Sequence, residues 1–216
     1  MTVPHPRIAP LGDAALTITW SDTIGPEVEA LVRQALSALR GQLGLDVELV
    51  PGYTTITAHY RTADWTYPSL RDALTPALSH PGEIAASEEG RLIEIPVRYD
   101  GPDLESVAVQ AGLTVREVVA CHTATEYRVA LLGFVPGWAY LGQLDPALVL
   151  PRRTTPRPRV PAGSVAIAGA QTGVYPAETP GGWHLIGRTT ALMFDPTRTP
   201  PALLAVGDRV RFVAEV

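Results

Sequence analysis

Residues 163–189 read GSVAIAGAQTGVYPAETPGGWHLIGRT, and this stretch decides the fold class of the second half of the chain. Its β-like segments, at 164–168 and 184–188, are separated by glycines and prolines that favour turns. The same pattern extends further, because ten of the 19 glycines and eleven of the 21 prolines lie beyond residue 130. Many short strands joined by such turns predict a β-barrel or a β-sandwich.

The first part of the chain has a different pattern. Residues 14–20 alternate apolar side chains with threonine, as a half-buried strand does. We expect a helix over about residues 23–40, strands at 46–50 and 54–60, and a second helix from about 69 to 78. The order strand, helix, strand, strand, helix is typical of a ferredoxin-like unit.

The best candidate for a domain boundary is the polar, aperiodic stretch 79–90. We therefore predict an α+β protein of two domains, a ferredoxin-like α/β domain over 1–85 and a β-barrel domain over 86–216. A strand is also expected at 91–98. From the sequence alone, this strand could either close the first domain or open the second.

The charged residues exclude several chemistries. All 17 basic residues are arginine, and the chain has no lysine. A P-loop lysine, a Schiff base, a lysine general base and a biotin attachment site are therefore excluded on this chain. Phosphate or carboxylate would have to be bound by arginine or by backbone N–H groups. The net charge of −5 argues against nucleic-acid binding.

Other features of the sequence bear on location and on metals. The single cysteine, Cys121, cannot form an intramolecular disulfide, and the first ten residues do not resemble a secretory signal. The longest apolar run is too short for a membrane span and is broken by Pro136. We expect a cytoplasmic protein that does not enter the membrane. The five histidines show no spacing typical of a metal site.

An aromatic segment and a histidine are the first candidates for a binding site. Residues 133–142 place aromatic rings, including that of Trp138, between glycines and prolines. A rigid segment of this kind can present its rings at a pocket wall, and the alternative is a barrel corner whose rings fill the core. His122 could act as an acid or a base near neutral pH, although a lone histidine is more often structural.

Arginines form the second candidate. Four of them lie within residues 152–159, where prolines hold the chain extended. They could present guanidinium groups to a carboxylate or a phosphate, or they could belong to a solvated loop. On the strand predicted at 184–188, His184 and Arg188 are expected to share one face, so this strand could line a cleft.

These clusters together are similar to the allophanate hydrolase subunit 1 family, which includes the B subunit of the bacterial 5-oxoprolinase and a sporulation kinase inhibitor. The matching stretches follow the family's order along nearly the whole chain. They include VPGY at 50–53, GFVPGW at 133–138, TPR at 155–157, VPAGSV at 160–165, QTGVYP at 171–176 and PGGW at 180–183.

The resemblance implies an α/β N-terminal domain followed by a cyclophilin-like β-barrel domain. It also implies one subunit of an ATP-dependent 5-oxoprolinase, which opens the lactam of 5-oxo-L-proline to give L-glutamate. Such a chain would be active only with a carboxyltransferase-like subunit 2 and with a third, TIM-type subunit of the 5-oxoprolinase. ATP and Mg would be shared with the complex or supplied by it, since this chain shows no self-sufficient ATP site, and biotin would not be attached to this chain.

The resemblance and the residues together suggest half of an active site, completed by subunit 2. We predict that Arg157 and Arg188 contact an anion and that His122 transfers a proton or donates a hydrogen bond. The side chains expected to bind substrate are Gln171, Tyr175, Trp138 and His184. No metal ligand is expected among these residues.

Other functions remain open at this point. The chain could inhibit a histidine kinase by binding it through exposed aromatic side chains such as Trp138. It could also be a carboxyltransferase component of urea or amide carboxylation, with biotin carried by another chain. A prolyl isomerase is suggested only by analogy of fold and is therefore ranked last.

Overall fold

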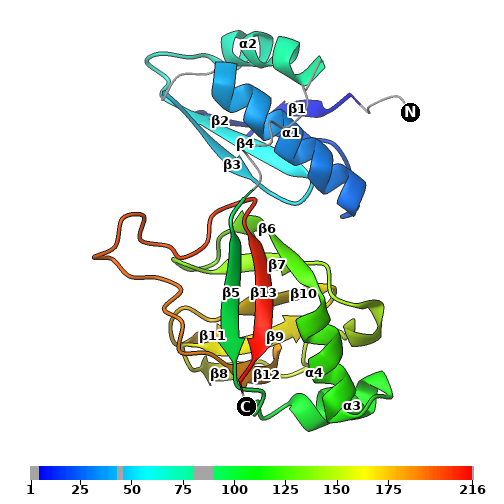
Figure 1. Ribbon diagram of the computed structural model, residues 1–216. Coiled ribbons are helices and arrows are strands. Elements are labelled where there is room, and N and C mark those ends of the chain that lie inside the picture. The colour runs from blue at the N-terminus through cyan, green and yellow to red at the C-terminus, as the bar shows by residue number, and fades with distance from the viewer. Residues whose placement is uncertain (1–4, 43–45, 80–89, 216) are drawn as a thin grey trace. The chain divides into compact units, whose positions relative to one another are not determined.

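The computed structural model describes residues 5–42, 46–79 and 90–215, which form two compact units that divide the chain at Gly90 (Figure 1). Each unit has a sheet and helices of its own. The boundary expected between residues 85 and 86 lies outside the described residues.

The N-terminal unit is an antiparallel sheet in the order β1-β2-β4-β3 with two helices. Its elements are β1 (Arg7–Pro10), β2 (Ala15–Thr19), α1 (Pro26–Gln42), β3 (Val47–Pro51), β4 (Thr55–Tyr60) and α2 (Tyr67–Ser79). Leu16 pairs with Ala58 and Ile18 with Ile56, and all four side chains are inaccessible to solvent. The period-two pattern of the sequence thus marks the face of the sheet that belongs to the core.

The ferredoxin-like description of this unit is not confirmed. A ferredoxin-like unit would place a strand that follows the second helix beside the first strand of the sheet. Here that edge position is occupied by β1, which precedes β2 and pairs with it as a hairpin. The strand after α2, β5 (Leu92–Val97), pairs instead with β13 (Arg209–Ala214) in the C-terminal unit. This pairing answers the question that the sequence left open for residues 91–98.

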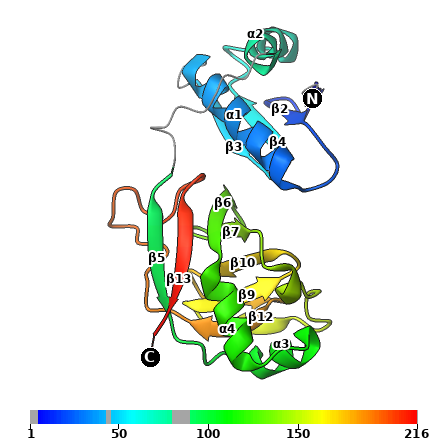
Figure 2. The same cartoon turned by 45° about the vertical axis from the view of Figure 1, so that its right-hand side comes forward.

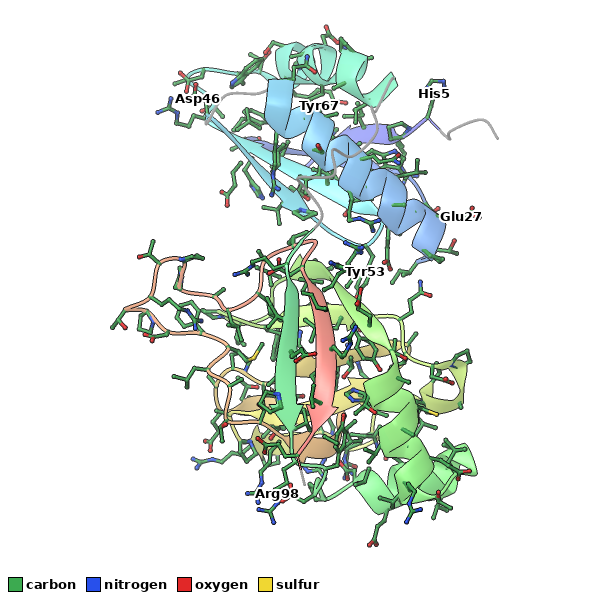
Figure 3. All side chains as sticks on the ribbon, in the orientation of Figure 1. His5, Glu27, Asp46, Tyr53, Tyr67 and Arg98 are labelled. Atoms are coloured by element: carbon green, nitrogen blue, oxygen red, sulfur yellow. The ribbon has the colours of Figure 1, made fainter. Side chains whose placement is uncertain are left out.

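The C-terminal unit is a nearly closed, barrel-like sheet in the order β12-β9-β10-β7-β6-β13-β5. The strands not yet named are β6 (Glu126–Leu132), β7 (Ala139–Gly142), β9 (Ser164–Ala168), β10 (Gln171–Val174) and β12 (His184–Arg188). Arg98, which follows β5 and is labelled in Figure 3, forms a bridge with Arg188 at the end of β12. Each N–H donates to the other residue's carbonyl oxygen at 2.9 Å, which joins the two outermost strands. This architecture is consistent with a cyclophilin-like fold.

Helices and a small ribbon complete the C-terminal unit. Helices α3 (Leu104–Ala111) and α4 (Val115–Ala124) lie against β12 and β13 (Figure 2). A 3-10 helix, η2 (Pro146–Leu148), contacts both of them. The ribbon consists of β8 (Arg157–Val160) and β11 (Thr179–Gly181), which pair with each other outside the large sheet.

Strand β9 is buried on both faces. Val165 and Ile167 belong to the main core, together with apolar residues of the other strands and of α3 and α4. Ala166 and Ala168 face a second cluster that contains Trp138, Val160, Tyr175, Trp183 and Leu185. Part of the aromatic segment therefore fills a core. Burial of each large apolar side chain stabilises the fold by about 1.5–3 kcal/mol.

Candidate functional site

A cavity of about 470 Å³ lies where β8, β9 and β12 meet, and we call it the arginine pocket. Its lining includes Arg157, Arg159, Arg188 and Asp100. Three guanidinium groups against one carboxylate make the lining electropositive. The volume lies within the range of about 300–1,000 Å³ that is typical of small-molecule sites.

A buried carboxylate holds one of these arginines in place. Asp103, which is 3% exposed, accepts hydrogen bonds at Oδ1 from Arg157 Nη2 at 2.7 Å and from Arg153 Nη1 at 2.8 Å. Its Oδ2 accepts from the backbone N–H of Leu185 at 2.7 Å. Burial by itself raises the pKa of Asp103, but these hydrogen bonds and the two positive charges outweigh it, so the pKa lies below its usual value. The carboxylate stays ionised and fixes the Arg157 guanidinium beside the pocket.

The guanidinium of Arg157 is not fully hydrogen-bonded within the protein. Its Nη1 is buried and donates to no atom of the residues that the structure describes. Arg188 is more exposed, and its Nη2 donates to Asp100 Oδ2 at 2.7 Å. The same oxygen lies 2.9 Å from Arg98 Nε. Such a pocket can bind a carboxylate or a phosphate by charge-assisted hydrogen bonds.

Aromatic side chains surround a second, smaller cavity of about 190 Å³, which we call the aromatic pocket. The Trp138 ring lies edge-to-face against Tyr175 and Trp183, at centroid distances of 4.7 and 5.1 Å. A Cβ at Gly173 would lie 3.1 Å from the indole, so a glycine there lets the ring rest on β10. The exposed side chain of Arg152 completes the lining.

The ribbon β8–β11 contributes to both pockets. Gly181 lines the aromatic pocket, and its cross-strand partner Arg157 lines the arginine pocket. Gly181 itself is required there, because a Cβ would collide with the hydroxyl group of Tyr175. Four predicted residues therefore line cavities: Arg157 and Arg188 line one, and Trp138 and Tyr175 line the other.

His122 lies in the main core and lines neither pocket. Its Nδ1 is 2.6 Å from the Tyr99 hydroxyl and its Nε2 is 2.8 Å from Thr172 Oγ1. Because Thr172 Oγ1 donates to the carbonyl oxygen of Ala166, we assign the imidazole proton to Nε2. Burial lowers the pKa of His122 to about 3. The proton-transfer role stays a prediction that this geometry does not support.

The pairing of the strands also fixes the positions of the remaining predicted residues. Gln171 pairs with Ala168 and Gly142 on β10 and lines neither pocket. The side chain of His184 is buried, and its Nε2 donates to the carbonyl oxygen of Pro151 at 2.9 Å. The expectation that His184 and Arg188 share a face is wrong. A bulge between Leu185 and Gly187 shifts the register, so that His184 pairs with Ile167 and Arg188 with Ser164, on opposite faces of β9.

Comparison with known proteins identifies the family. The carboxyltransferase domain, subdomain C and D, matches residues 6–204. The chain belongs to this family. It is 40% identical to the B subunit of 5-oxoprolinase from Bacillus subtilis (strain 168) over 227 residues, which cover 99% of the chain and 94% of the relative. It is 50% identical to the B subunit of 5-oxoprolinase from Escherichia coli O157:H7 over 78% of each protein. The resemblance found from the motifs is thus confirmed.

Solved structures share the fold of this chain. The crystal structure of TTHA0988 aligns with a TM-score of 0.81 at 38% identity over 94% of the chain, which spans only 40% of that protein. A conserved uncharacterized protein, PH0987 from Pyrococcus horikoshii, is 39% identical over 97% of both chains, with a TM-score of 0.57. The K. lactis urea amidolyase, at 15% identity and a TM-score of 0.77, shares the fold, and the chain covers 15% of its length.

The side chains of this family member do not fit a complete Mg·ATP site. The chain has no lysine, and the described residues contain no group of three His, Cys, Asp or Glu side chains that could hold a metal ion. The arginine pocket instead offers donors for one anionic group. We assign no step on this chain to ATP. None of the described helices has the length and apolar character needed to cross a membrane.

Replacement of Asp103 with asparagine should lower the free energy of unfolding by about 2 kcal/mol. An amide cannot accept from two arginines and from the Leu185 N–H at once, because one of its two polar atoms is a donor. Chemical denaturation measures the change. The matched control is Asp100→Asn, a more exposed carboxylate that should cost about 0.5 kcal/mol or less. Equal losses in the two variants would contradict the anchoring role of Asp103.

Proposed function

We propose that this chain is the B subunit of an ATP-dependent 5-oxoprolinase, which opens 5-oxo-L-proline to L-glutamate. The observation that carries the proposal is the 40% identity to the corresponding 5-oxoprolinase protein of Bacillus subtilis, which extends over 99% of the chain. The motif resemblance and the 50% identity to the B subunit of 5-oxoprolinase from Escherichia coli O157:H7 support the same assignment. The location remains a prediction, and we expect it to be cytoplasmic.

The arginine pocket is the part of this chain that we assign to the reaction. A carboxylate or a developing oxyanion placed there would lie against the guanidinium of Arg157, which lines the pocket with a side chain that is 23% exposed. Asp103 accepts from Nη2 of this guanidinium, so the group is oriented before an anion arrives. Preorganised donors of this kind stabilise charge that develops in a transition state.

The rest of the active site would come from companion subunits. The relatives are named as subunits, and TTHA0988 is much longer than this chain, which supports a larger assembly. We propose that subunit 2 and the third, TIM-type subunit complete the site and supply the binding of ATP and Mg. The two pockets described above would then form half of the catalytic surface.

Omission of this chain from a reconstituted complex should abolish ATP-dependent formation of glutamate from 5-oxoproline. We expect this loss because the arginine pocket is supplied only by this chain. Glutamate is measured with the two companion subunits in the presence and absence of the purified chain. Addition of the chain back should restore the activity. Undiminished turnover without it would contradict the proposed function.

A carboxyltransferase component of urea or amide carboxylation is the second candidate. It is favoured by the family match, which is to a carboxyltransferase domain. Because the chain has no lysine, biotin would have to arrive on a carrier protein. A biotinylated carrier, urea and bicarbonate should then yield carboxylated urea when the chain is present. If no carboxylated urea forms and glutamate is formed from 5-oxoproline, the carboxyltransferase candidate is excluded and the 5-oxoprolinase assignment is supported.

A further inference from the structure

The ion pairs around the arginine pocket leave an excess of positive charge. Asp100 is shared by two arginines, and so is Asp103. A third carboxylate, that of Glu178, lies 3.6 Å from Arg159. Among the described residues, these pairs therefore set five arginines against three carboxylates, and the arginines are Arg98, Arg153, Arg157, Arg159 and Arg188. Because the whole chain has a net charge of −5, the excess is local, and a ligand with two negative charges would balance it.

Ser164 adds an uncharged donor to the same cavity. It lies on β9, is 7% exposed and lines the pocket. It pairs with Arg188 of β12, and paired residues of neighbouring strands point their side chains to the same face, with Cβ atoms about 4.5–5.5 Å apart. Its hydroxyl group makes no hydrogen bond with the part of the chain that the structure describes. A ligand oxygen that accepts from this nearly buried group would therefore bind favourably.

The donors of the pocket come from three strands. Arg157 and Arg159 are two residues apart on β8, so both side chains lie on one face of that strand. Ser164 belongs to β9 and Arg188 to β12. A carboxylate has two oxygens in one plane and is satisfied by a single guanidinium fork, whereas a phosphoryl group has three acceptor oxygens that point in different directions. Donors from three strands therefore match a tetrahedral dianion better than a carboxylate.

We propose that the arginine pocket binds a phosphoryl group, free or as part of a ligand, in preference to a carboxylate, and that Ser164 makes this distinction. Arg157 and Arg188 supply the positive charge, and the Ser164 hydroxyl donates to an oxygen that a planar carboxylate does not present to it. The cavity of about 470 Å³ is larger than one phosphate group, so the remainder of a ligand can share it. The inference goes beyond the proposed function, because it concerns what the isolated chain binds.

Four small anions test the proposal on the purified full chain. Inorganic phosphate and methyl phosphate carry a tetrahedral dianion, malonate carries two planar carboxylates and acetate carries one. Calorimetry at about pH 7.5 should show that each phosphate binds at least about tenfold more tightly than malonate or acetate. Equal affinities for the two phosphates would indicate a phosphoryl group that belongs to a larger ligand, and binding of inorganic phosphate alone would indicate the free ion. Binding of malonate as tight as that of phosphate, or no binding of either phosphate, would overturn the proposal.

Variants of the pocket separate shape from charge. Ser164→Ala should weaken binding of both phosphates about tenfold and leave that of malonate unchanged, because only the tetrahedral ion reaches the hydroxyl group. Arg188→Gln should weaken binding of every anion about tenfold, since it removes a positive charge. The matched controls are Ser106→Ala and Arg116→Gln, at exposed positions of α3 and α4, and neither should change an affinity. Chemical denaturation checks that each variant is folded. Unchanged phosphate binding by a folded Ser164→Ala chain would overturn the role of Ser164.

The reconstituted complex keeps this inference apart from the proposed function. Selective phosphate binding by a chain whose omission leaves glutamate formation undiminished would support the phosphate site and contradict the function. Glutamate formation that depends fully on the chain, with phosphate bound no more tightly than malonate, would support the function and contradict the phosphate site.

Discussion

Replacement of Arg157 with glutamine should lower glutamate formation by the reconstituted complex about a hundredfold. One nitrogen of this guanidinium donates to Asp103, and another is buried without a partner in the described part of the chain. Glutamine supplies neither the charge nor the forked geometry. Because Asp103 keeps Arg153 and the Leu185 N–H, the variant should fold. Initial rates at saturating substrate, with the variant chain and its companion subunits, measure the effect.

Two arginine variants serve as comparisons for Arg157→Gln. Arg116→Gln removes an equal charge from the exposed surface of α4 and should leave the rate unchanged. Arg159→Gln removes a guanidinium from the same pocket, but one that is 80% exposed and 3.6 Å from Glu178, so we expect a loss of about threefold. A full rate with Arg157→Gln would contradict the assignment. Equal losses of rate for Arg157→Gln and Arg159→Gln would show that the rate depends on the net charge of the pocket and not on the oriented guanidinium of Arg157.

Two kinds of strand could be predicted from the sequence. In one, one face of the strand is more apolar than the other, and in the other, an apolar run has a glycine at each end. The alternation at 14–20 predicts β2, and glycines at 163 and 169 bound the run that forms β9. Both signals are local, because they depend on side-chain burial within one strand. Pairing is not local. The hairpin of β1 with β2 and the parallel pair of β5 with β13 depend on which edges are left after the whole sheet has formed.

The candidate site shows the same limit. The arginine segment at 152–159 could be found from composition, and Arg157 does line a pocket. Its partner Asp103 is 54 residues away in the chain, and no spacing rule connects the two. Arginines that cluster in an acidic protein favour ion pairs with carboxylates. This preference was the one indication in the sequence that carboxylates such as Asp100 and Asp103 would contact the arginine segment. The bulge in β12, which separates His184 from Arg188, has no comparable signal.

The core position of His122 was not predictable either. The residue follows Cys121 near the end of α4, where a histidine often lies on the surface. In the structure its ring is 4.5 Å from that of Phe212 and nearly parallel to it, and both ring nitrogens have polar partners. These contacts favour the neutral imidazole, because a charged ring would have to be desolvated and one nitrogen would have to change from acceptor to donor.

Acidification should therefore destabilise the folded chain through His122 well before its carboxylates are protonated. Unfolded, this histidine has a pKa of 6.5, whereas burial lowers it to about 3 in the folded state. Between these values the unfolded state binds one more proton, so the stabilising contribution is complete above pH 6.5 and falls with pH by about 1.36 kcal/mol per unit. The loss reaches about 2 kcal/mol at pH 5 and about 4 kcal/mol at pH 3. Denaturant titrations of the chain between about pH 7.5 and pH 5, followed by tryptophan fluorescence, measure it.

The matched variant is His122→Gln, which keeps a donor and an acceptor but does not titrate. It should be less stable than the natural chain at pH 7.5, because the contact with Phe212 is lost. Its free energy of unfolding should nevertheless be flat where that of the natural chain falls. The difference between the two slopes isolates the histidine from every other titrating group, since all of those are present in both proteins. Parallel slopes would mean that His122 is protonated in the folded state, and the neutral, hydrogen-bonded core position would then be wrong.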